Sequence, residues 1–105
     1  MNKTFSGKDD QAKMVVVTGA ARGIGLATSD LFISEGWHVA MVDRDAEELD
    51  KVLEERKGKL IKAFVCDVSS PESVAQMISA ANSWTGSVEA LVNNAGVADF
   101  GTIEE

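Results

Sequence analysis

Three closely spaced glycines, Gly19, Gly23 and Gly25, directly follow the apolar run Met14–Thr18. Such a run predicts a buried strand, and the glycines predict a turn that opens into a helix. Glycine permits backbone angles that other residues resist, and the missing Cβ lets phosphate groups approach the peptide N–H groups at a helix start. The segment therefore predicts a strand, a pyrophosphate-binding turn and a helix, with a plain tight turn as the alternative.

Each glycine has its own expected role. Gly19 makes the tight turn off the strand, Gly23 allows the phosphates to come close, and Gly25 lets the helix pack against the strand. The spacing is Thr-Gly-x-x-x-Gly-x-Gly, and Thr28 occupies the place of the third glycine in the commoner Gly-x-Gly-x-x-Gly pattern.

Four strand-like runs recur roughly every 25 residues, with amphipathic segments between them. The runs are Met14–Thr18, His38–Asp43, 60–66 and 88–93. Alternating strands and helices are typical of a parallel sheet that is covered on both faces. The chain is long enough for one such domain, and its polar first dozen residues are expected to be disordered.

Helix boundaries are marked by capping residues and glycines. The first helix is expected over residues 24–35, with Leu26, Leu31 and Phe32 among its buried positions and Gly36 at its end. A second helix is expected to start at Asp45, with Glu48 completing a capping box, and to end at Gly58.

Apolar residues recur at helical spacing in the second and third helices. In the second helix they are Leu49, Val52 and Leu53. The third helix is expected to begin at Ser70-Pro71-Glu72, and its core face comprises Val74, Met77, Ile78, Ala81 and Trp84. At these positions a core face is a better interpretation than a ligand site.

Composition excludes several kinds of function. The chain has 17 acidic and 10 basic residues, a net charge of −7, which argues against binding to nucleic acid or to an anionic membrane surface. Cys66 and His38 are the only residues of their types, so neither a disulfide within the chain nor a zinc site is expected. No signal peptide or membrane span is evident, and a cytoplasmic location is expected.

Further motifs follow the glycines in order: Asp43, then Asp67-Val68, then Asn93-Asn94-Ala95-Gly96. With these motifs the chain closely resembles the short-chain dehydrogenase/reductase family from about residue 13 to its last residue. The resemblance implies an α/β fold of the Rossmann type, a doubly wound parallel sheet whose first four strands have the order 3-2-1-4. Residues 13–105 are then expected to form part of a dinucleotide-binding domain.

The resemblance also implies a nicotinamide cofactor and a small alcohol or carbonyl substrate. Asp43 ends the second strand 24 residues after Gly19, where an acidic side chain binds the adenosine ribose. The same carboxylate repels the 2′-phosphate of NADP, so NAD is expected and NADP is less favoured. Arg22 and Arg44 occupy places where NADP-preferring relatives carry basic residues, and an ordinary surface role is about as well supported for them.

The remaining expected cofactor contacts come from the glycine turn and the later motifs. In similar proteins the aspartate at Asp67 accepts a bond from the adenine amino group, and the backbone N–H of Val68 serves a ring nitrogen; the alternative is that Asp67 only starts a turn. Asn93 and Asn94 tie adjacent strands together. Ala95 and Gly96 are small residues that admit the ribose. Ile24, in the glycine turn, is also expected to contact the cofactor.

The family's serine, Tyr-x-x-x-Lys pair and further asparagine follow the Asn-Asn-Ala-Gly motif, and the 105 residues contain no tyrosine. The chain is therefore interpreted as a catalytically incomplete, cofactor-binding piece of an alcohol/carbonyl oxidoreductase, without catalytic residues of its own. The alternative is a non-catalytic nucleotide-binding or interaction protein. Residues 90–92 are expected to form an open apolar edge that promotes self-association, and the complete enzyme is expected to be a homo-oligomer. Only residues 97–100 are expected near the substrate, whose identity the sequence does not indicate.

Overall fold

The computed structural model describes residues 13–85 and 88–94. In chain order the elements are β1 (Met14–Thr18), α2 (Gly23–Ser34), β2 (His38–Asp43), α3 (Ala46–Glu55), β3 (Ile61–Val65), α4 (Pro71–Thr85) and β4 (Ala90–Asn93). The expected disordered tail and the site residues Ala95 and Gly96 lie outside the described residues, as do residues 97–100.

The strands form one parallel sheet with the order β3-β2-β1-β4, which confirms the expected fold class and strand order. β1 lies between β2 and β4, so Val16 is opposite Ala40 on one side and Leu91 on the other. Because all strands run the same way, their carboxyl ends meet at one edge of the sheet. That edge collects the residues after Thr18, Asp43, Val65 and Asn93.

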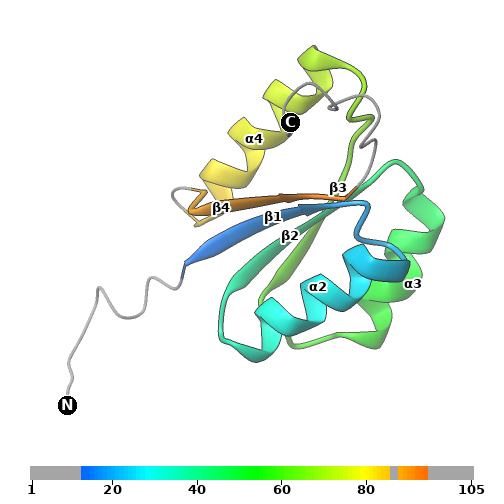
Figure 1. The fold of residues 1–105 in the computed structure, drawn as a ribbon, viewed down its shortest axis with the longest axis vertical. Coiled ribbons are helices and arrows are strands. Elements are labelled where there is room, and N and C mark those ends of the chain that lie inside the picture. Colours follow the sequence, from blue (N-terminus) through cyan, green and yellow to red (C-terminus); the bar gives the residue numbers. More distant parts are fainter. Residues whose placement is uncertain (1–12, 86–87, 95–105) are drawn as a thin grey trace.

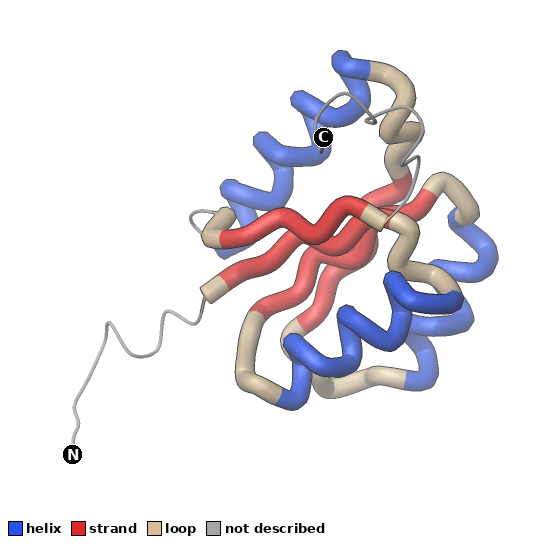
Figure 2. Tube along the Cα trace, in the orientation of Figure 1, coloured by secondary structure: helices blue, strands red, loops and turns tan. Residues whose placement is uncertain are grey.

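Helices cover both faces of the sheet: α2 and α3 lie on one side and α4 on the other (Figures 1 and 2). Successive side chains of a strand point to opposite faces, so each inner strand contributes to two cores. Val15, Val17 and Met41 belong to the core beneath α2 and α3. Val16 and Val42 belong to the core beneath α4.

The α2 helix shows where the apolar pattern misleads. It covers Gly23–Ser34 rather than 24–35, and Leu31, expected to be buried, is 60% exposed. The buried residues of α2 are Gly25 and Ser29, four residues apart on one helix face. These small residues let the helix lie close to the sheet, the expected Leu26 and Phe32 are partly buried against the same core, and Leu31 lies outside that surface.

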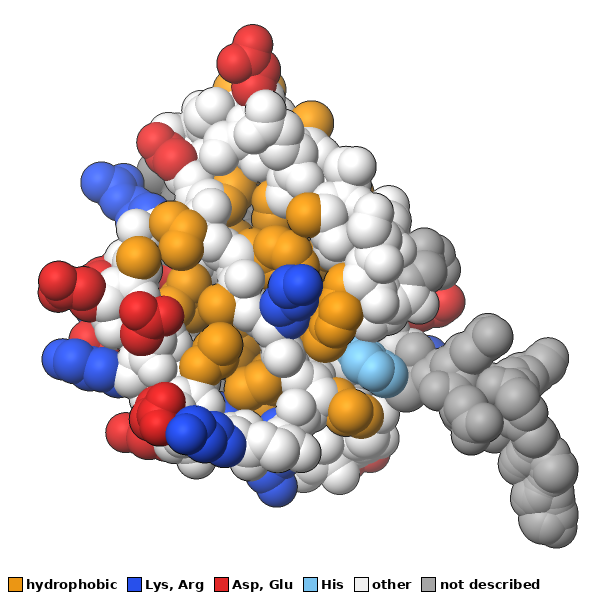
Figure 3. Space-filling view, turned by 180° about the vertical axis from the view of Figure 1, so that it is seen from behind, with side chains coloured by type: hydrophobic (Ala, Val, Ile, Leu, Met, Phe, Trp, Pro, Cys, Tyr) orange, Lys and Arg blue, Asp and Glu red, His pale blue; other side chains and the backbone are white. Residues whose placement is uncertain are grey.

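Two strands are shorter than expected. β3 begins at Ile61 because Leu60 is exposed, and β4 begins at Ala90 rather than at residue 88. Within the described part of the chain β3 and β4 are the outer strands, and their residues Val65 and Leu91 are largely exposed. Seen from the side opposite to Figure 1, hydrophobic side chains are visible over a broad area (Figure 3).

Capping chemistry explains the starts of α3 and α4. The Oδ1 atom of Asp45 accepts a hydrogen bond from the Glu48 N–H at 3.1 Å, and Ser70 Oγ accepts one from the Ser73 N–H at 3.2 Å. Both expected caps are confirmed. The reciprocal half of the capping box at Asp45 is not formed, because the Asp45 N–H donates to Asp43 Oδ1; the Glu48 carboxylate lies 3.8 Å from the cations of both Arg22 and Lys51.

The apolar stripes of α3 and α4 pack as expected. Leu49 and Val52 of α3 are buried, and so are Met77 and Ala81 of α4. The other members of both stripes pack around them: Leu53 in α3, and Val74, Ile78 and Trp84 in α4. Gly36 and Gly58 follow α2 and α3 with φ of 88° and 87°. No helix of the described residues is long and apolar enough to cross a membrane.

Candidate functional site

The turn after β1 is held against the end of β2. Gly19 adopts a φ of 63°, which lets the chain leave the strand sharply. The Ala20 N–H then donates to the Val42 carbonyl oxygen and the Ala21 N–H donates to Asp43 Oδ2, each at 3.0 Å. The glycine turn is therefore a fixed structure at the carboxyl edge of the sheet.

Gly25 and Gly23 differ in the space around them. A Cβ at Gly25 would overlap the backbone carbonyl of Gly19, so only glycine lets α2 start this close to the turn. Gly23 has a φ of 61°, and a Cβ there would meet no described atom within 4 Å. The space at Gly23 is open, as required where a ligand approaches the backbone.

The amino end of α2 differs from those of α3 and α4. Arg22 is its N-cap residue, and within the described residues no side chain caps the helix. Its first turn contains no acidic residue, whereas α3 has Glu47 and Glu48 there and α4 has Glu72. The first N–H groups of a helix need an acceptor and favour negative charge. The α2 start therefore has the properties of an anion-binding site.

Asp43 lies at the end of β2 and is only 9% exposed. Its Oδ2 atom accepts the hydrogen bond from Ala21, and its Oδ1 atom accepts one from the Asp45 N–H at 3.0 Å. One carboxylate thus joins the glycine turn to the loop before α3. A carboxylate oxygen has further acceptor capacity, so this linkage leaves Asp43 able to accept bonds from a ligand.

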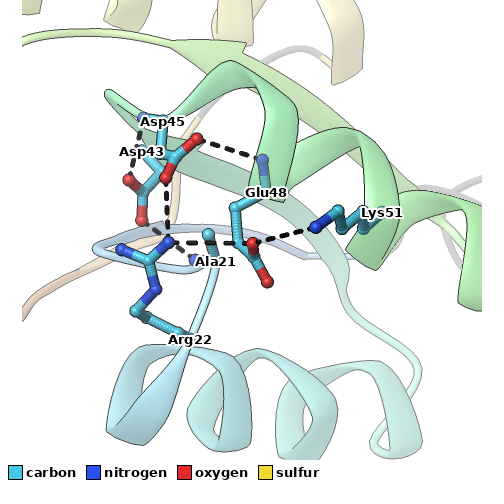
Figure 4. A network of polar contacts seen from close by, with 6 residues as sticks. All are labelled: Ala21, Arg22, Asp43, Asp45, Glu48 and Lys51. Carbon is cyan, nitrogen blue, oxygen red and sulfur yellow. Dashed lines mark hydrogen bonds and ion pairs between the residues drawn. The ribbon is translucent and has the colours of Figure 1, made fainter.

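Arg22 extends from the glycine turn toward the start of α3 (Figure 4). Its Nη2 atom lies 2.8 Å from Asp45 Oδ2 and 3.8 Å from Glu48 Oε1. The hydrogen bond with Asp45 raises the pKa of Arg22, and the same bond lowers the pKa of Asp45. Arg44, the second basic residue expected at the cofactor, is exposed at the start of the same loop.

Asp67 makes the turn between β3 and α4. Its Oδ1 atom accepts hydrogen bonds from the N–H of Ser69 at 3.0 Å and from its hydroxyl at 2.7 Å. The hydroxyl bond is the main cause of a lowered pKa of Asp67. The side chain is exposed, so the turn role and the adenine role are compatible.

Thr18 links β1 to β4. Its hydroxyl donates to Asn93 Oδ1 at 2.9 Å and accepts from the Asn94 N–H at 2.9 Å. The Asn93 side chain thus ties β4 to β1 as expected, whereas Asn94 does so through its backbone N–H. The Nδ2 atom of Asn94 is buried, with no hydrogen-bond acceptor among the described residues.

An apolar cavity of about 240 Å³ opens beside Thr18 and Asn93, between the sheet and α4. Its other lining residues are Val68, Val74, Met77, Ile78 and Leu91. Val68 is the one expected adenine contact among them. Nowhere in residues 13–85 and 88–94 do three or more His, Cys, Asp or Glu side chains gather as a metal site would require.

Sequence reasoning did not include Thr18 and Asp45 among the site residues. Thr18 stands directly before Gly19, so its place at the end of β1 was the available signal. Asp45 was expected only as a helix cap, and its pairing with Arg22 depends on how the two loops meet in space. The structure thus brings together at one edge the glycine turn, Asp43, Asp67, Val68, Asn93 and Asn94.

Comparison with known proteins agrees with this arrangement. The model of the short chain dehydrogenase family matches residues 13–105. The chain belongs to the short chain dehydrogenase family. A curated relative, 2-(S)-hydroxypropyl-CoM dehydrogenase 3 of Xanthobacter autotrophicus, is 35% identical over 100 residues, covering 89% of this chain and 37% of the relative.

Two solved structures of short chain dehydrogenases are similar in fold and sequence. An actinorhodin polyketide ketoreductase with NADPH has a TM-score of 0.78 and 33% identity, covering 88% of this chain and 35% of that chain. A metagenomic short-chain oxidoreductase in complex with NADP has a TM-score of 0.74 and 37% identity, covering 81% and 39%. The chain therefore spans about two fifths of the length of these relatives.

The two structures bear on the expected preference for NAD. Both contain the phosphorylated cofactor, NADPH in one and NADP in the other. Members of the short chain dehydrogenase family bind NAD or NADP, and these neighbours give no reason to rank NADP below NAD.

Proposed function

We propose that this chain forms the NAD(P)-binding part of an oxidoreductase that interconverts an alcohol and a carbonyl compound. The observation that supports this most directly is the α2 amino end, which has neither a side-chain cap within the described residues nor an acidic first turn. It faces the open space at Gly23 and lies at the same sheet edge as Asp43 and Asn93. When bound, a nicotinamide cofactor supplies hydride transfer.

The residues of this edge take complementary roles in the proposal. The N–H groups at Gly23 and Ile24 bind the pyrophosphate, and Gly19 and Gly25 hold the turn in shape. Asp43 accepts bonds from the ribose hydroxyls, while Asp67 and Val68 bind adenine beside the apolar cavity. Asn93, Asn94, Ala95 and Gly96 are assigned to the second ribose of the cofactor, and the Nδ2 atom of Asn94, which has no acceptor among the described residues, is a donor for it.

Within this proposal, NAD binds more tightly than NADP. A 2′-phosphate at the Asp43 ribose meets a carboxylate, and two unit charges about 4 Å apart repel by about 1 kcal/mol even in water. That corresponds to about a fivefold difference in binding. Arg22, in the glycine turn, is already paired with Asp45 and Glu48.

Calorimetric titration of the chain with NADH and NADPH tests the proposal. Gly23→Ala is expected to abolish measurable binding, because its Cβ fills the space reserved for the phosphates. Gly36→Ala is the matched control, since Gly36 also has a positive φ and open surroundings but lies at the other end of α2. Equal losses in both variants, or no binding by the unmodified chain, would contradict the proposal.

Binding and turnover are separable in this experiment. The resemblance assigns general acid/base catalysis to a tyrosine, and the 105 residues contain none. We therefore expect the chain to bind NADH without oxidising it in the presence of any carbonyl compound. Turnover by the purified chain that is lost in Gly23→Ala would contradict this expectation.

A further inference from the structure

Arg22 and Asp45 form an ion pair between the two loops that border the proposed ribose site. The Nη2 atom of Arg22 lies 2.8 Å from Asp45 Oδ2, and the two side chains are 62% and 40% exposed. Glu48, one turn into α3, lies 3.8 Å from the same nitrogen. The Arg22 guanidinium is therefore directed from the glycine turn toward α3 (Figure 4).

Asp45 is positioned for this contact by two hydrogen bonds. Its backbone N–H donates to Asp43 Oδ1 at 3.0 Å, and its own Oδ1 atom caps α3 by accepting from the Glu48 N–H. The second oxygen, Oδ2, is the one that accepts from Arg22. Because Asp43 also accepts from the Ala21 N–H, residues 21–22 and 43–45 form a closed ring of contacts.

The ring sets up a competition for one cation. A 2′-phosphate on the ribose at Asp43 needs positive charge nearby, and Arg22 adjoins Ala21, which is bonded to Asp43. Arginine binds phosphate and carboxylate with the same donor groups, so a phosphate competes with Asp45 for the Nη2 donor of Arg22 and for the direction of its guanidinium. The carboxylates of Asp45 and Glu48 thus oppose binding of the phosphorylated cofactor through their hold on Arg22.

We propose that Asp45, assisted by Glu48, is a positioning residue that holds Arg22 away from the ribose 2′-position and so sets the preference between NAD and NADP. The proposal rests on the proposed function, because it requires the adenosine ribose to lie at Asp43. Asp45 dominates because its contact with Arg22 is the shorter one. Arg44 is present in every variant of the test.

Asp45→Asn separates the ion pair from the helix cap. Asparagine caps helices as well as aspartate does, so the bond to the Glu48 N–H is retained while the charge that holds Arg22 is removed. Asp30→Asn is the matched control. Asp30, on α2, also pairs with an arginine, Arg56, but neither residue belongs to the ring of contacts around Asp45. Both variants raise the net charge by one.

The experiment measures calorimetric affinities for adenosine 5′-monophosphate and adenosine 2′,5′-bisphosphate, which differ only in the 2′-phosphate. Asp45→Asn is expected to improve the affinity for the bisphosphate relative to the monophosphate by about fivefold, the effect of freeing one exposed ion-pair partner. Asp30→Asn is expected to change that ratio less than about twofold. Glu48→Gln is expected to give a smaller change in the same direction as Asp45→Asn.

The same titrations in an Arg22→Ala background show whether Asp45 acts through Arg22. If it does, Asp45→Asn no longer changes the affinity ratio when Arg22 is absent. In the single variant, the Nε–Hε resonance of Arg22 is expected to shift when the bisphosphate binds, whereas that of Arg56 stays in place. This readout is independent of any enzymatic activity.

Each outcome decides between the two proposals. An unchanged ratio in Asp45→Asn, with the monophosphate still bound, overturns the positioning role and leaves the proposed function intact. An equal gain with and without Arg22 also overturns it, because the carboxylate then repels the phosphate directly. Failure of the unmodified chain to bind either nucleotide overturns the proposed function and the positioning role together.

Discussion

The Asp43 carboxylate accepts a hydrogen bond from the backbone N–H of Ala21 at 3.0 Å, across 22 residues of sequence. Its other oxygen accepts from the Asp45 N–H. A single side chain therefore satisfies one backbone donor in the glycine turn and one in the loop before α3. The shape of this sheet edge depends on Asp43 before any ligand is present.

Asp43→Ala is expected to lower the free energy of unfolding by about 2 kcal/mol or more, because two backbone donors lose a charged acceptor. Urea denaturation followed by circular dichroism measures the change. Asp50→Ala provides the control, since Asp50 is exposed on α3 and its replacement should stay within about 0.5 kcal/mol. Equal stability of the two variants would show that Asp43 serves only a ligand.

Gly25→Ala is expected to destabilise the fold more than Gly36→Ala. The first variant places a Cβ against the Gly19 carbonyl, which belongs to the backbone and cannot rotate away. The second introduces backbone strain at positive φ, about 1 to 2 kcal/mol, but no clash. Thermal or urea unfolding of both variants tests the order, and a Gly25→Ala protein as stable as Gly36→Ala would contradict the close approach of α2 to the turn.

Thr18→Val is expected to cost about 1 to 3 kcal/mol of unfolding free energy, because the nearly isosteric side chain leaves the Asn94 N–H and the Asn93 oxygen without this partner. Hydrogen exchange at the Asn94 amide is expected to speed up in the same variant. Thr85→Val is the comparison, because the Thr85 hydroxyl is buried with no partner among the described residues. That change is expected to be neutral or stabilising, and similar losses at both positions would refute the link.

Stability is expected to depend on pH through Asp30. Arg56 donates to both carboxylate oxygens of Asp30, at 2.6 Å and 2.8 Å, and these bonds lower the Asp30 pKa below its ordinary value of 3.8. A lowered pKa means that the stabilisation is present above about pH 4 and is lost as pH falls through the folded-state pKa. Because the Asp30 side chain is 47% exposed, solvent screening limits the stabilisation from this ion pair to about 1 kcal/mol or less.

Unfolding free energies of the unmodified protein and Asp30→Asn, measured from pH 7 to pH 2, test this dependence. The two proteins should differ at neutral pH and converge in acid. Glu54→Gln is the control, because the Glu54–Lys57 pair is exposed on both sides and its loss should matter little at any of these pH values. A constant difference for Asp30→Asn would rule out the ion pair as its cause.

Self-association through β4 remains a prediction from the sequence, with a direct test. Leu91 is 58% exposed on an outer strand of the described sheet, and a charge at such an edge opposes strand pairing between molecules. Leu91→Glu is expected to reduce the concentration dependence of the sedimentation coefficient. Leu31→Glu, at a leucine of similar exposure on α2, should not. A chain that stays monomeric at every concentration would contradict the prediction.

The inner strands could be predicted from the sequence because they are continuously apolar and end at unambiguous residues. β1 and β2 have the expected bounds, Thr18 precedes a glycine and Asp43 ends its run. The outer strands were harder, because each has a partner on only one side and a terminal apolar residue of the run can be exposed. Leu60 is such a residue, and β3 begins after it.

The site could be predicted as a set of positions but not as a set of contacts. Sequence order placed the glycine turn, Asp43, Asp67 and Asn93 at one sheet edge, because parallel strands end together. The partner of Arg22 could not be predicted, since Asp45 is 23 residues away. Its Oδ1 atom has the expected capping role, and its Oδ2 atom accepts from Arg22. On the inner face of α2 the packing role of Gly25 was expected, but Ser29 was missed because it is not apolar, yet it faces the sheet.

The central place of β1 has a consequence for how the protein folds. β1 can pair with β2 across a single crossover, but pairing with β4 must bring together Thr18 and Asn93, 75 residues apart. The entropy of closing a loop grows with its length, and contacts distant in sequence slow folding, so β4 is expected to join the sheet last. A nucleotide that needs both the glycine turn and the asparagines can bind only after that step. Its binding therefore draws late intermediates toward the finished sheet.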